Sequence, residues 1–289
     1  KKKFKMEDIS SLSEKDLEEE FFKALKFGLL SEISIILSQA VKSGYTLIKS
    51  RDSQGHTPMH WAAKSGDIEL LNLLQHYGAS IDDETLNESR MRPIHWGASE
   101  GKISTIKFMI DNHVDLNSQD SHGCTPAIIA AQHNQITCLI FLIKNGANID
   151  ICDINGDSVA HWAAYKGHCE LLGALAFLRP QDLTLGDNYG QTPLHLASLR
   201  GYLDCVEYLV SKCQCDPLLK DRNGSSSLDL SIKKGHRKIE WFLRKSISPT
   251  ICHEISTLGI QKLFNIRNCI SFLCGQSDKE LMNWPWRVV

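Results

Sequence analysis

Apolar residues recur at steps of three and four along most of this chain, in short segments that come in pairs. One segment carries Ile68 and Leu71, and another carries Cys205, Tyr208 and Leu209. This spacing places the apolar side chains on one face of a helix. A pair of short helices cannot bury such a face alone, so the pattern predicts an all-α protein whose helix pairs stack on one another.

One motif recurs at the start of the first helix of a pair, at offsets of 33 to 35 residues. Its five copies occupy residues 57–63, 92–98, 125–131, 159–164 and 192–198. Glycine before the motif permits a tight turn, proline starts a helix without needing a backbone donor, and paired alanines let helices approach closely. The Thr-Pro-Leu-His-x-Ala-Ala form with this period is identified as the ankyrin-repeat signature.

This resemblance implies an ankyrin-repeat solenoid of about seven helix-turn-helix repeats with a C-terminal helical extension. Residues 1–13 are expected to form a mobile tail, and residues 247–289 the extension. The repeats are expected at about 14–50, 51–84, 85–118, 119–152, 153–186, 187–220 and 221–246. The first lacks the motif but opens on a capping-box pair, Ser13 and Asp16, and in the last Asp229 replaces the motif histidine.

Polar residues also recur at fixed places. Aspartates mark the turns between repeats, where a carboxylate can accept hydrogen bonds from turn amides. They are Asp52, Asp120, Asp153, Asp187 and Asp221. The four motif histidines are predicted to be structural, with rings bonded within their own and adjacent turns. They are His60, His95, His161 and His195.

Composition and motifs favour a binding protein over an enzyme. The 289 residues carry a net charge of −2 and ten scattered cysteines, which is typical of reduced thiols in a cytosolic setting. No phosphate loop, G-x-S-x-G, H-E-x-x-H or dinucleotide motif is present, so no catalytic residue, metal site or cofactor is predicted. Basic residues gather at one end and not along the stack, which disfavours nucleic-acid binding.

That basic end is the carboxyl-terminal one, where ten Lys and Arg residues from Lys233 onward outnumber four Asp and Glu residues. Apolar residues at helical spacing after Ser248 predict one or two amphipathic helices. These helices either fold back on the last repeat as a cap or lead to a membrane. The cluster Trp284–Arg287 is aromatic and basic, a composition common beside membranes, so contact with an anionic membrane is expected near this end.

Three repeats carry tryptophan directly after the motif histidine: Trp61, Trp96 and Trp162. In one interpretation the indoles are core side chains that fill space between repeats. In the other, their edges reach the concave groove and form an aromatic stripe for an extended, proline-containing peptide.

A narrower resemblance rests on the motifs His60–Ala63, His95–Trp96, Ala160–Tyr165 and Leu185–Asp187. They resemble the cytosolic domain of the ankyrin-repeat DHHC palmitoyltransferases, the huntingtin-interacting type and its fungal relatives, over roughly residues 51–246. The resemblance implies a stack on the cytosolic face that captures substrates through a short motif ending in Gln-Pro. It also implies a parent that is an integral membrane protein of the Golgi or endomembrane system.

Within this resemblance, the family's key tryptophan matches Trp96, and its partner asparagine is replaced by Ser65. A hydroxyl is shorter than an amide and cannot offer the amide's paired donor and acceptor. Together with Trp61, Trp162 and Lys64, these two residues are the candidate peptide-binding set. The catalytic Asp-His-His-Cys is absent from the sequence, so these residues do not themselves transfer an acyl group.

Two other functions fit the same sequence. The chain can be a stand-alone cytosolic adaptor or inhibitor with no enzyme activity. It can also be the cytosolic end of an ion channel, although that function gives no reason for the series of His-Trp pairs.

Overall fold

The computed structural model describes residues 12–247 and divides the chain into two compact units, Lys1–His122 and Gly123–Val289. The first unit holds α2 (Glu14–Phe27), α3 (Leu30–Lys42), the 3-10 turn η1 (Leu47–Lys49), α4 (Pro58–Ser65), α5 (Ile68–His76), α6 (Pro93–Ser99) and α7 (Ile103–Asp111). The second holds α8 (Pro126–Gln132), α9 (Ile136–Lys144), α10 (Val159–Lys166), α11 (Cys169–Leu178), η2 (Pro180–Leu183), α12 (Pro193–Arg200), α13 (Leu203–Ser211), α14 (Ser227–Lys234) and α15 (Arg237–Ile247).

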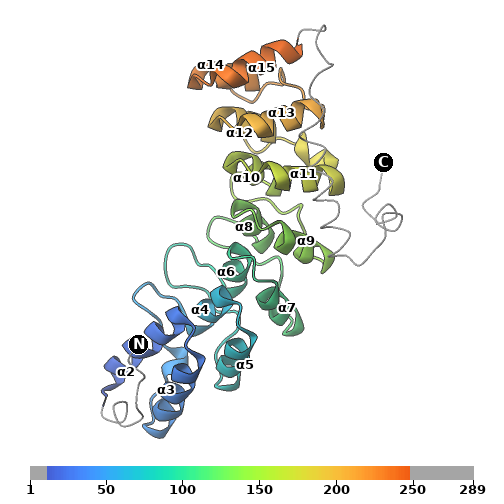
Figure 1. The fold of residues 1–289 in the computed structure, drawn as a ribbon. Coiled ribbons are helices and arrows are strands. Elements are labelled where there is room, and N and C mark those ends of the chain that lie inside the picture. Colours follow the sequence, from blue (N-terminus) through green and yellow to red (C-terminus); the bar gives the residue numbers. More distant parts are fainter. Residues whose placement is uncertain (1–11, 248–289) are drawn as a thin grey trace. The chain divides into compact units, whose positions relative to one another are not determined.

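The α-helices form seven helix-turn-helix pairs, three in the first unit and four in the second (Figure 1). Within residues 12–247 the only strand-like pairing is an isolated bridge between Lys220 and Ser226. The predicted all-helical stack is therefore confirmed. The expected extension at 247–289 and most of the expected tail at 1–13 lie outside the described residues.

Neighbouring pairs pack through their first helices, α4 against α6 in the first unit and α8, α10, α12 and α14 in order in the second. The paired alanines make this close approach feasible, and Ala62, Ala63, Ala163 and Ala164 are all fully buried. Gly97 replaces one alanine on α6, and a Cβ atom there would lie 2.6 Å from Thr105 Cγ2. Side chains at these positions must therefore be very small.

The motif histidine bonds a backbone oxygen further along the chain, which lies in the next repeat for His60 and His161 and at the end of the same repeat for His95 and His195. The backbone N–H of Thr57 donates to Nδ1 of His60 over 3.2 Å, which leaves the proton on Nε2, and Nε2 donates to the carbonyl oxygen of Met91 over 2.9 Å. Three more rings repeat this bond: His95 donates to Ser118, His161 to Gln191 and His195 to Leu219, over 2.9 to 3.1 Å. The structural role predicted for these four histidines is confirmed.

Two helix starts use carboxylates for the same purpose. Ser226 donates its N–H and its hydroxyl to Asp229 Oδ2, over 2.9 and 2.7 Å, while its Oγ accepts from the N–H of Asp229. Asp229 therefore closes the turn that histidine closes in other repeats. At the start of α2, Ser13 accepts from the N–H of Asp16 and donates to its carboxylate, as the capping box predicts.

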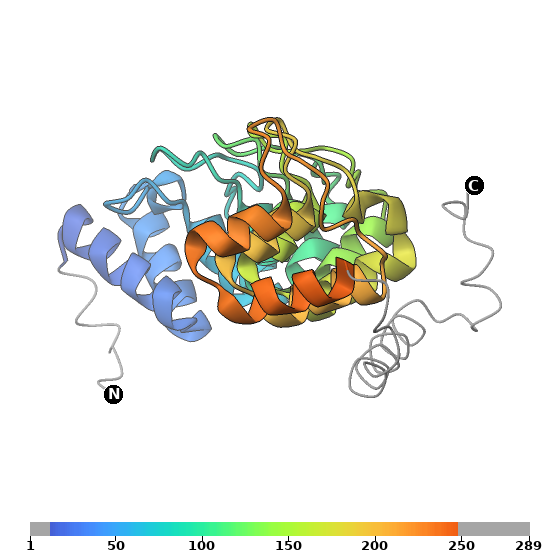
Figure 2. The ribbon, with the colours of Figure 1, turned by 90° about the horizontal axis from the view of Figure 1, so that it is seen from above.

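The turns between repeats are built on the recurring aspartates. Oδ1 of Asp153 accepts from the N–H groups of Asn155 and Asp157, over 2.8 and 2.9 Å, and Asp187 and Asp221 accept two turn amides in the same way. Backbone bonds then link successive turns, as from Asn188 N–H to the carbonyl of Asn155 over 3.0 Å. Figure 2 shows the turns of the second unit extending side by side from the helices.

The buried imidazoles predict a loss of stability in acid. Burial is the main cause that lowers the pKa of His60 from 6.5 to about 4. Between these values the unfolded chain binds a proton that the folded chain does not, so the free energy of unfolding falls as the pH drops through this range. We expect a loss of about 1 to 3 kcal/mol from this group, measured by urea unfolding at pH 7.5 and pH 4.5. His60→Gln should lose less than the wild type over the same interval. Equal losses in both proteins would contradict the assignment.

Candidate functional site

Two of the three motif tryptophans lie in one cluster of rings in the first unit, formed by His56, His60, Trp61 and Trp96. The centroids of Trp61 and Trp96 are 5.3 Å apart, with the ring planes at 81°. His56 meets Trp96 at 4.6 Å and 64°, and His60 meets it at 5.4 Å and 71°. These edge-to-face contacts are favourable for aromatic rings, so the four rings form one rigid group, the Trp61–Trp96 cluster.

A single carboxylate anchors this cluster. Asp52 Oδ2 accepts hydrogen bonds from Trp61 Nε1 over 3.2 Å and is bonded to His56 Nδ1 over 3.0 Å. Burial opposes ionisation of Asp52, yet the hydrogen bonds from His56 and from the N–H of Gln54 outweigh it and hold the pKa of Asp52 below its usual value. The charged form is therefore the one that fixes both rings.

The outer side of the cluster carries amines. Lys26 Nζ lies 5.1 Å from the ring centroid of Trp61, and Lys64 Nζ lies 5.8 and 5.7 Å from the centroids of Trp61 and Trp96. Lys64 also pairs with Glu100 over 3.7 Å. Both indoles are half-buried, so they fill space between α4 and α6 and still reach the surface. The two interpretations of the tryptophans are thus compatible at these positions.

Ser65, the residue at the place of the family's asparagine, is exposed at the end of α4. Its Oγ donates to the carbonyl of Ala62 over 2.8 Å and accepts from the N–H of Asp67 over 3.2 Å. The hydroxyl is thus engaged in the helix terminus. An amide is present elsewhere in the cluster, because Asn87 Nδ2 lies 3.3 Å from His56 Nε2.

His56 and Asn87 were missed by sequence reasoning, and Asp52 was predicted only as a turn residue. The signal available was the four-residue spacing of Asp52 and His56 around the turn before the motif, which sets both on one side of that turn. Asn87 gives no such signal, because its contact with His56 spans 31 residues.

Trp162 belongs to the second unit and has its own surroundings. Its Nε1 donates to Asp153 Oδ2 over 2.9 Å, and its ring meets Tyr165 at 5.6 Å and 81°. It lines a hollow of about 330 Å³ between the turns and first helices of two successive repeats. The structure thus brings Trp61, Trp96 and Lys64 together, while action of Trp162 on the same ligand stays a prediction.

Asp157 lines that hollow, where its surroundings disfavour the ionised form of its carboxyl group. Burial, together with the nearby carboxylates of Asp153 and Asp187, raises the pKa of Asp157 from 3.8 to about 7. Its Oδ1 is buried and accepts no hydrogen bond from the residues that the structure describes.

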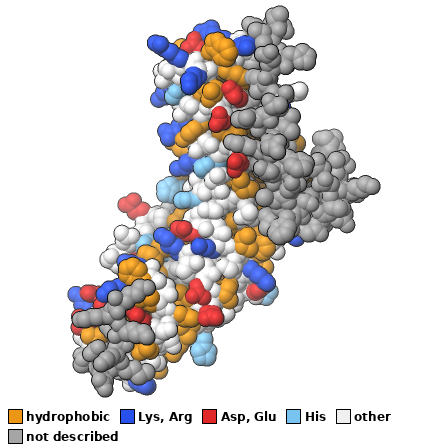
Figure 3. Space-filling view, in the orientation of Figure 1, with side chains coloured by type: hydrophobic (Ala, Val, Ile, Leu, Met, Phe, Trp, Pro, Cys, Tyr) orange, Lys and Arg blue, Asp and Glu red, His pale blue; other side chains and the backbone are white. Residues whose placement is uncertain are grey.

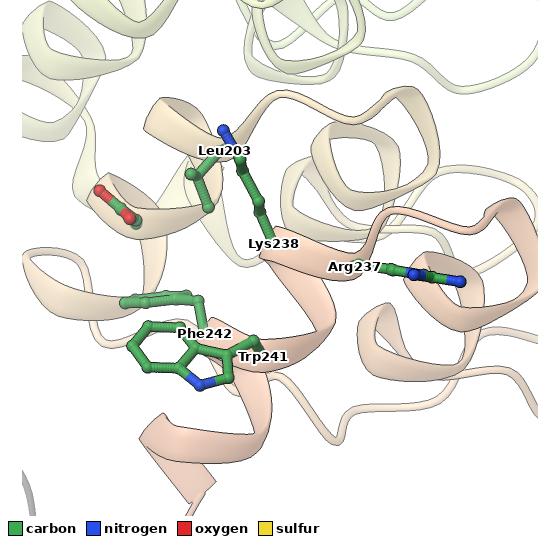
Figure 4. A pocket seen from close by; sticks show the side chains of 6 residues that line it. Leu203, Arg237, Lys238, Trp241 and Phe242 are labelled. Atoms are coloured by element: carbon green, nitrogen blue, oxygen red, sulfur yellow. The ribbon is translucent and has the colours of Figure 1, made fainter.

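A further surface lies at the α13–α15 end, where a hollow of about 340 Å³ is lined by Leu203, Glu207, Arg237, Lys238, Trp241 and Phe242. The indole of Trp241 is 63% exposed and Lys245 Nζ lies 4.9 Å from its centroid. Figure 4 shows Trp241 beside Phe242, with Leu203 reaching in from α13. Sequence reasoning did not single out Trp241, although the steep contrast between apolar and charged faces of 237–247 was available.

Among the described residues no three His, Cys, Asp or Glu side chains gather as metal ligands, and none of the helices has the length and apolar character of a membrane span. Burial also raises the pKa of the Cys138 thiol to about 12, which keeps it protonated and unreactive.

Family models match most of the repeat region. A model described as ankyrin repeats in three copies matches residues 94–179 and 160–251, and a model of one ankyrin repeat matches residues 54–86.

Three similar proteins differ in how much of them the chain covers. The Saccharomyces cerevisiae protein named as 26S proteasome regulatory subunit p28 is 26% identical over 225 residues, 77% of this chain and 93% of p28. The Danio rerio protein named as palmitoyltransferase ZDHHC13 is 23% identical over 263 residues, 88% of this chain and 37% of ZDHHC13. The Homo sapiens transient receptor potential cation channel subfamily A member 1 is 30% identical over 129 residues, 44% of this chain and 11% of the channel.

The raised pKa of Asp157 predicts that an amide is more stable than the acid at this position. The titratable groups around it are Asp153 and Asp187 on the turns and His161 on α10. Because its folded pKa is raised, Asp157 lowers the free energy of unfolding as the pH rises from about 4 to about 7. Asp157→Asn should therefore gain about 1 kcal/mol at pH 8, after allowing for solvent screening, and nearly nothing at pH 4. Urea unfolding at both pH values measures this, and an equal effect at both would contradict it.

Proposed function

The chain belongs to the ankyrin-repeat family, and on that premise we propose that it is a protein-binding module that holds an extended peptide against the Trp61–Trp96 cluster. The observation that carries this proposal is the pair of half-buried indoles, fixed edge to face by Asp52 and reached by Lys64 at the surface. Rigid aromatic groups bind without losing much conformational freedom, which is why they dominate binding energy at interfaces.

A proline-containing segment suits this surface. Its ring stacks on an indole, and its backbone is already restricted before binding, so little entropy is lost. Polar partners for the residues beside the proline are close at hand: the ammonium of Lys64 next to both indoles and the amide of Asn87 beside His56. Asn87 carries the kind of group that Ser65 lacks, and its Oδ1 accepts hydrogen bonds from Thr85 and Ser89.

The finer proposal is that the module recruits substrates for a membrane-bound protein S-palmitoyltransferase. The motif resemblance supports it, as does the similarity to ZDHHC13 over 88% of this chain. In that role the stack faces the cytosol and delivers a protein whose Gln-Pro motif is held at Trp96. Acyl transfer would then belong to a catalytic domain elsewhere in the parent protein.

A stand-alone adaptor is the second candidate, and a specific observation favours it: the similarity to p28 extends over 93% of p28. In this case the same indole pair binds a cytosolic partner with no enzyme attached. The parent reading frame distinguishes the two functions. An apolar span followed by a Cys-rich Asp-His-His-Cys segment supports the first, and a stop codon directly after Val289 supports the second.

Trp96→Ala tests the peptide site. Removing this indole should weaken binding of a Gln-Pro-containing peptide by about 1 to 3 kcal/mol, because the ring lies at the centre of the cluster. Isothermal titration calorimetry with the full chain measures the change. Trp241→Ala is the matched control, since it removes an exposed indole from the second unit and should leave the affinity unchanged. Unaltered affinity in a folded Trp96→Ala protein would contradict the proposal that the peptide binds at this cluster.

We also propose that the α14–α15 end contacts anionic membrane surfaces. Its cations are Lys233, Lys234, Arg237, Lys238, Arg244 and Lys245. Figure 3 shows Lys and Arg side chains gathered at this end together with apolar ones. Basic side chains next to an exposed indole fit the charge and depth of a lipid headgroup layer.

Flotation with vesicles tests this contact. The chain should float with phosphatidylserine-containing vesicles, and less so at high salt, because each Lys or Arg near the surface contributes roughly 1 kcal/mol that salt screens. Lys238→Glu with Lys245→Glu should reduce flotation, whereas Lys107→Glu on α7 should not. Equal flotation with purely zwitterionic vesicles would count against the proposal.

A further inference from the structure

The hollow around Trp162 is built from two successive repeats of the second unit. The turn before α10 and α10 itself form one wall, and the turn before α12, with Leu196 and Leu199 on α12, forms the other. Three aromatic side chains, Trp162, Tyr165 and Tyr189, line it, and so do the carboxyl groups of Asp157 and Asp187. Its volume of about 330 Å³ lies at the small end for ligand sites, so it suits one side chain better than a whole ligand of drug size.

The aromatic walls are fixed and already attract cations. The indole of Trp162 is held by Asp153 and braced edge-on by Tyr165. At the rim, the guanidinium carbon of Arg200 lies 4.7 Å from the ring centroid of Tyr165, and Lys166 Nζ lies 5.9 Å from that of Trp162. Such contacts are the mark of cation–π attraction. Within residues 12–247 neither cation is ion-paired with Asp157.

The turn does not require an acidic side chain at position 157. It stands four residues after the turn aspartate, where the other four repeats with such an aspartate carry His56, Cys124, Gln191 and Ser225. His56 Nδ1 is bonded to the carboxylate of Asp52, and Gln191 Nε2 donates to Asp221. Asp157 instead places a second carboxyl group beside Asp153 and leaves Oδ1 buried without a partner among the described residues.

When Asp157 is ionised, it lies near the carboxylates of Asp153 and Asp187 and lowers the free energy of unfolding. A bound cation would offset this loss of stability. The aromatic faces supply negative potential to the same cation, and a side chain entering between the turns would lose its own water there. The carboxyl groups and the aromatic rings therefore both favour a cationic ligand.

We propose that this hollow binds the cationic end of a lysine or arginine side chain presented by a partner protein, between Trp162, Tyr165 and Tyr189 and against Asp157. The inference rests on the proposed function only in that the side chain belongs to a bound protein. It uses no residue of the Trp61–Trp96 cluster, so the two sites can fail separately.

The test uses the full chain at pH 8, where Asp157 is ionised, and three capped pentapeptides with glycine on both sides of a central lysine, arginine or norleucine. Binding is followed by NMR titration of the indole N–H signals. We expect at least one cationic peptide to bind about tenfold tighter than the norleucine peptide, which has the same length but no charge. Asp157→Asn should reduce that affinity about tenfold. Asp204→Asn, which removes an equal charge on α13 outside the hollow, should leave it unchanged.

The lysine and arginine arms identify which basic group is preferred, and either preference supports the proposal. Equal binding of the norleucine peptide overturns it, as does unchanged affinity in Asp157→Asn. Trp96→Ala separates the two sites, because it should weaken Gln-Pro binding and leave the pentapeptide titration unchanged. Loss of Gln-Pro binding alone would thus bear on the Trp61–Trp96 cluster and not on this hollow.

Discussion

The hydrogen bond from a buried imidazole to a backbone oxygen at the end of its own repeat or in the next one is the contact on which the stack depends. Each first helix that begins with the motif is short, seven or eight residues, and an isolated helix of that length is not stable in water. The ring of His60 accepts a hydrogen bond from the N–H of Thr57 at the start of its own helix and donates one to the carbonyl of Met91. In the repeats of His60 and His161, helix formation and contact with the next repeat therefore occur together, as the cooperativity of repeat proteins requires.

Both candidate binding surfaces follow from this arrangement. The residue after the histidine must lie on the same short helix, close to the turn aspartate of its own repeat. Trp61 and Trp162 therefore bond to Asp52 and Asp153 in the same way. What differs is the residue four places after that aspartate, His56 in one repeat and Asp157 in the other. One position thus decides between an aromatic group that includes an imidazole and a hollow that holds a second carboxyl group.

Much of the fold was readable from the sequence because it is periodic. The motif spacing predicted the helix pairs, the turn aspartates predicted their own amide bonds, and the capping role of Ser13 with Asp16 followed from residue type. The pairing of Trp61 with Trp96 was less accessible. It depends on how closely α4 and α6 approach, which small residues such as Ala62 and Gly97 permit but do not specify. The contacts of Asn87 and Tyr189 come from turn conformation, for which periodicity carries no information.

The acceptor of the imidazole bond is always a backbone oxygen, and the four residues that provide it are Met91, Ser118, Gln191 and Leu219. Since every amino acid carries such an oxygen, the bond places no demand on the side chain at the acceptor position, whether that position lies in the next repeat or at the end of the same one. Gene duplication or loss of a whole repeat can then lengthen or shorten the array without new compensating mutations at the seam. Evolution is left free to vary the residues that face a guest while the coupling between modules is inherited unchanged.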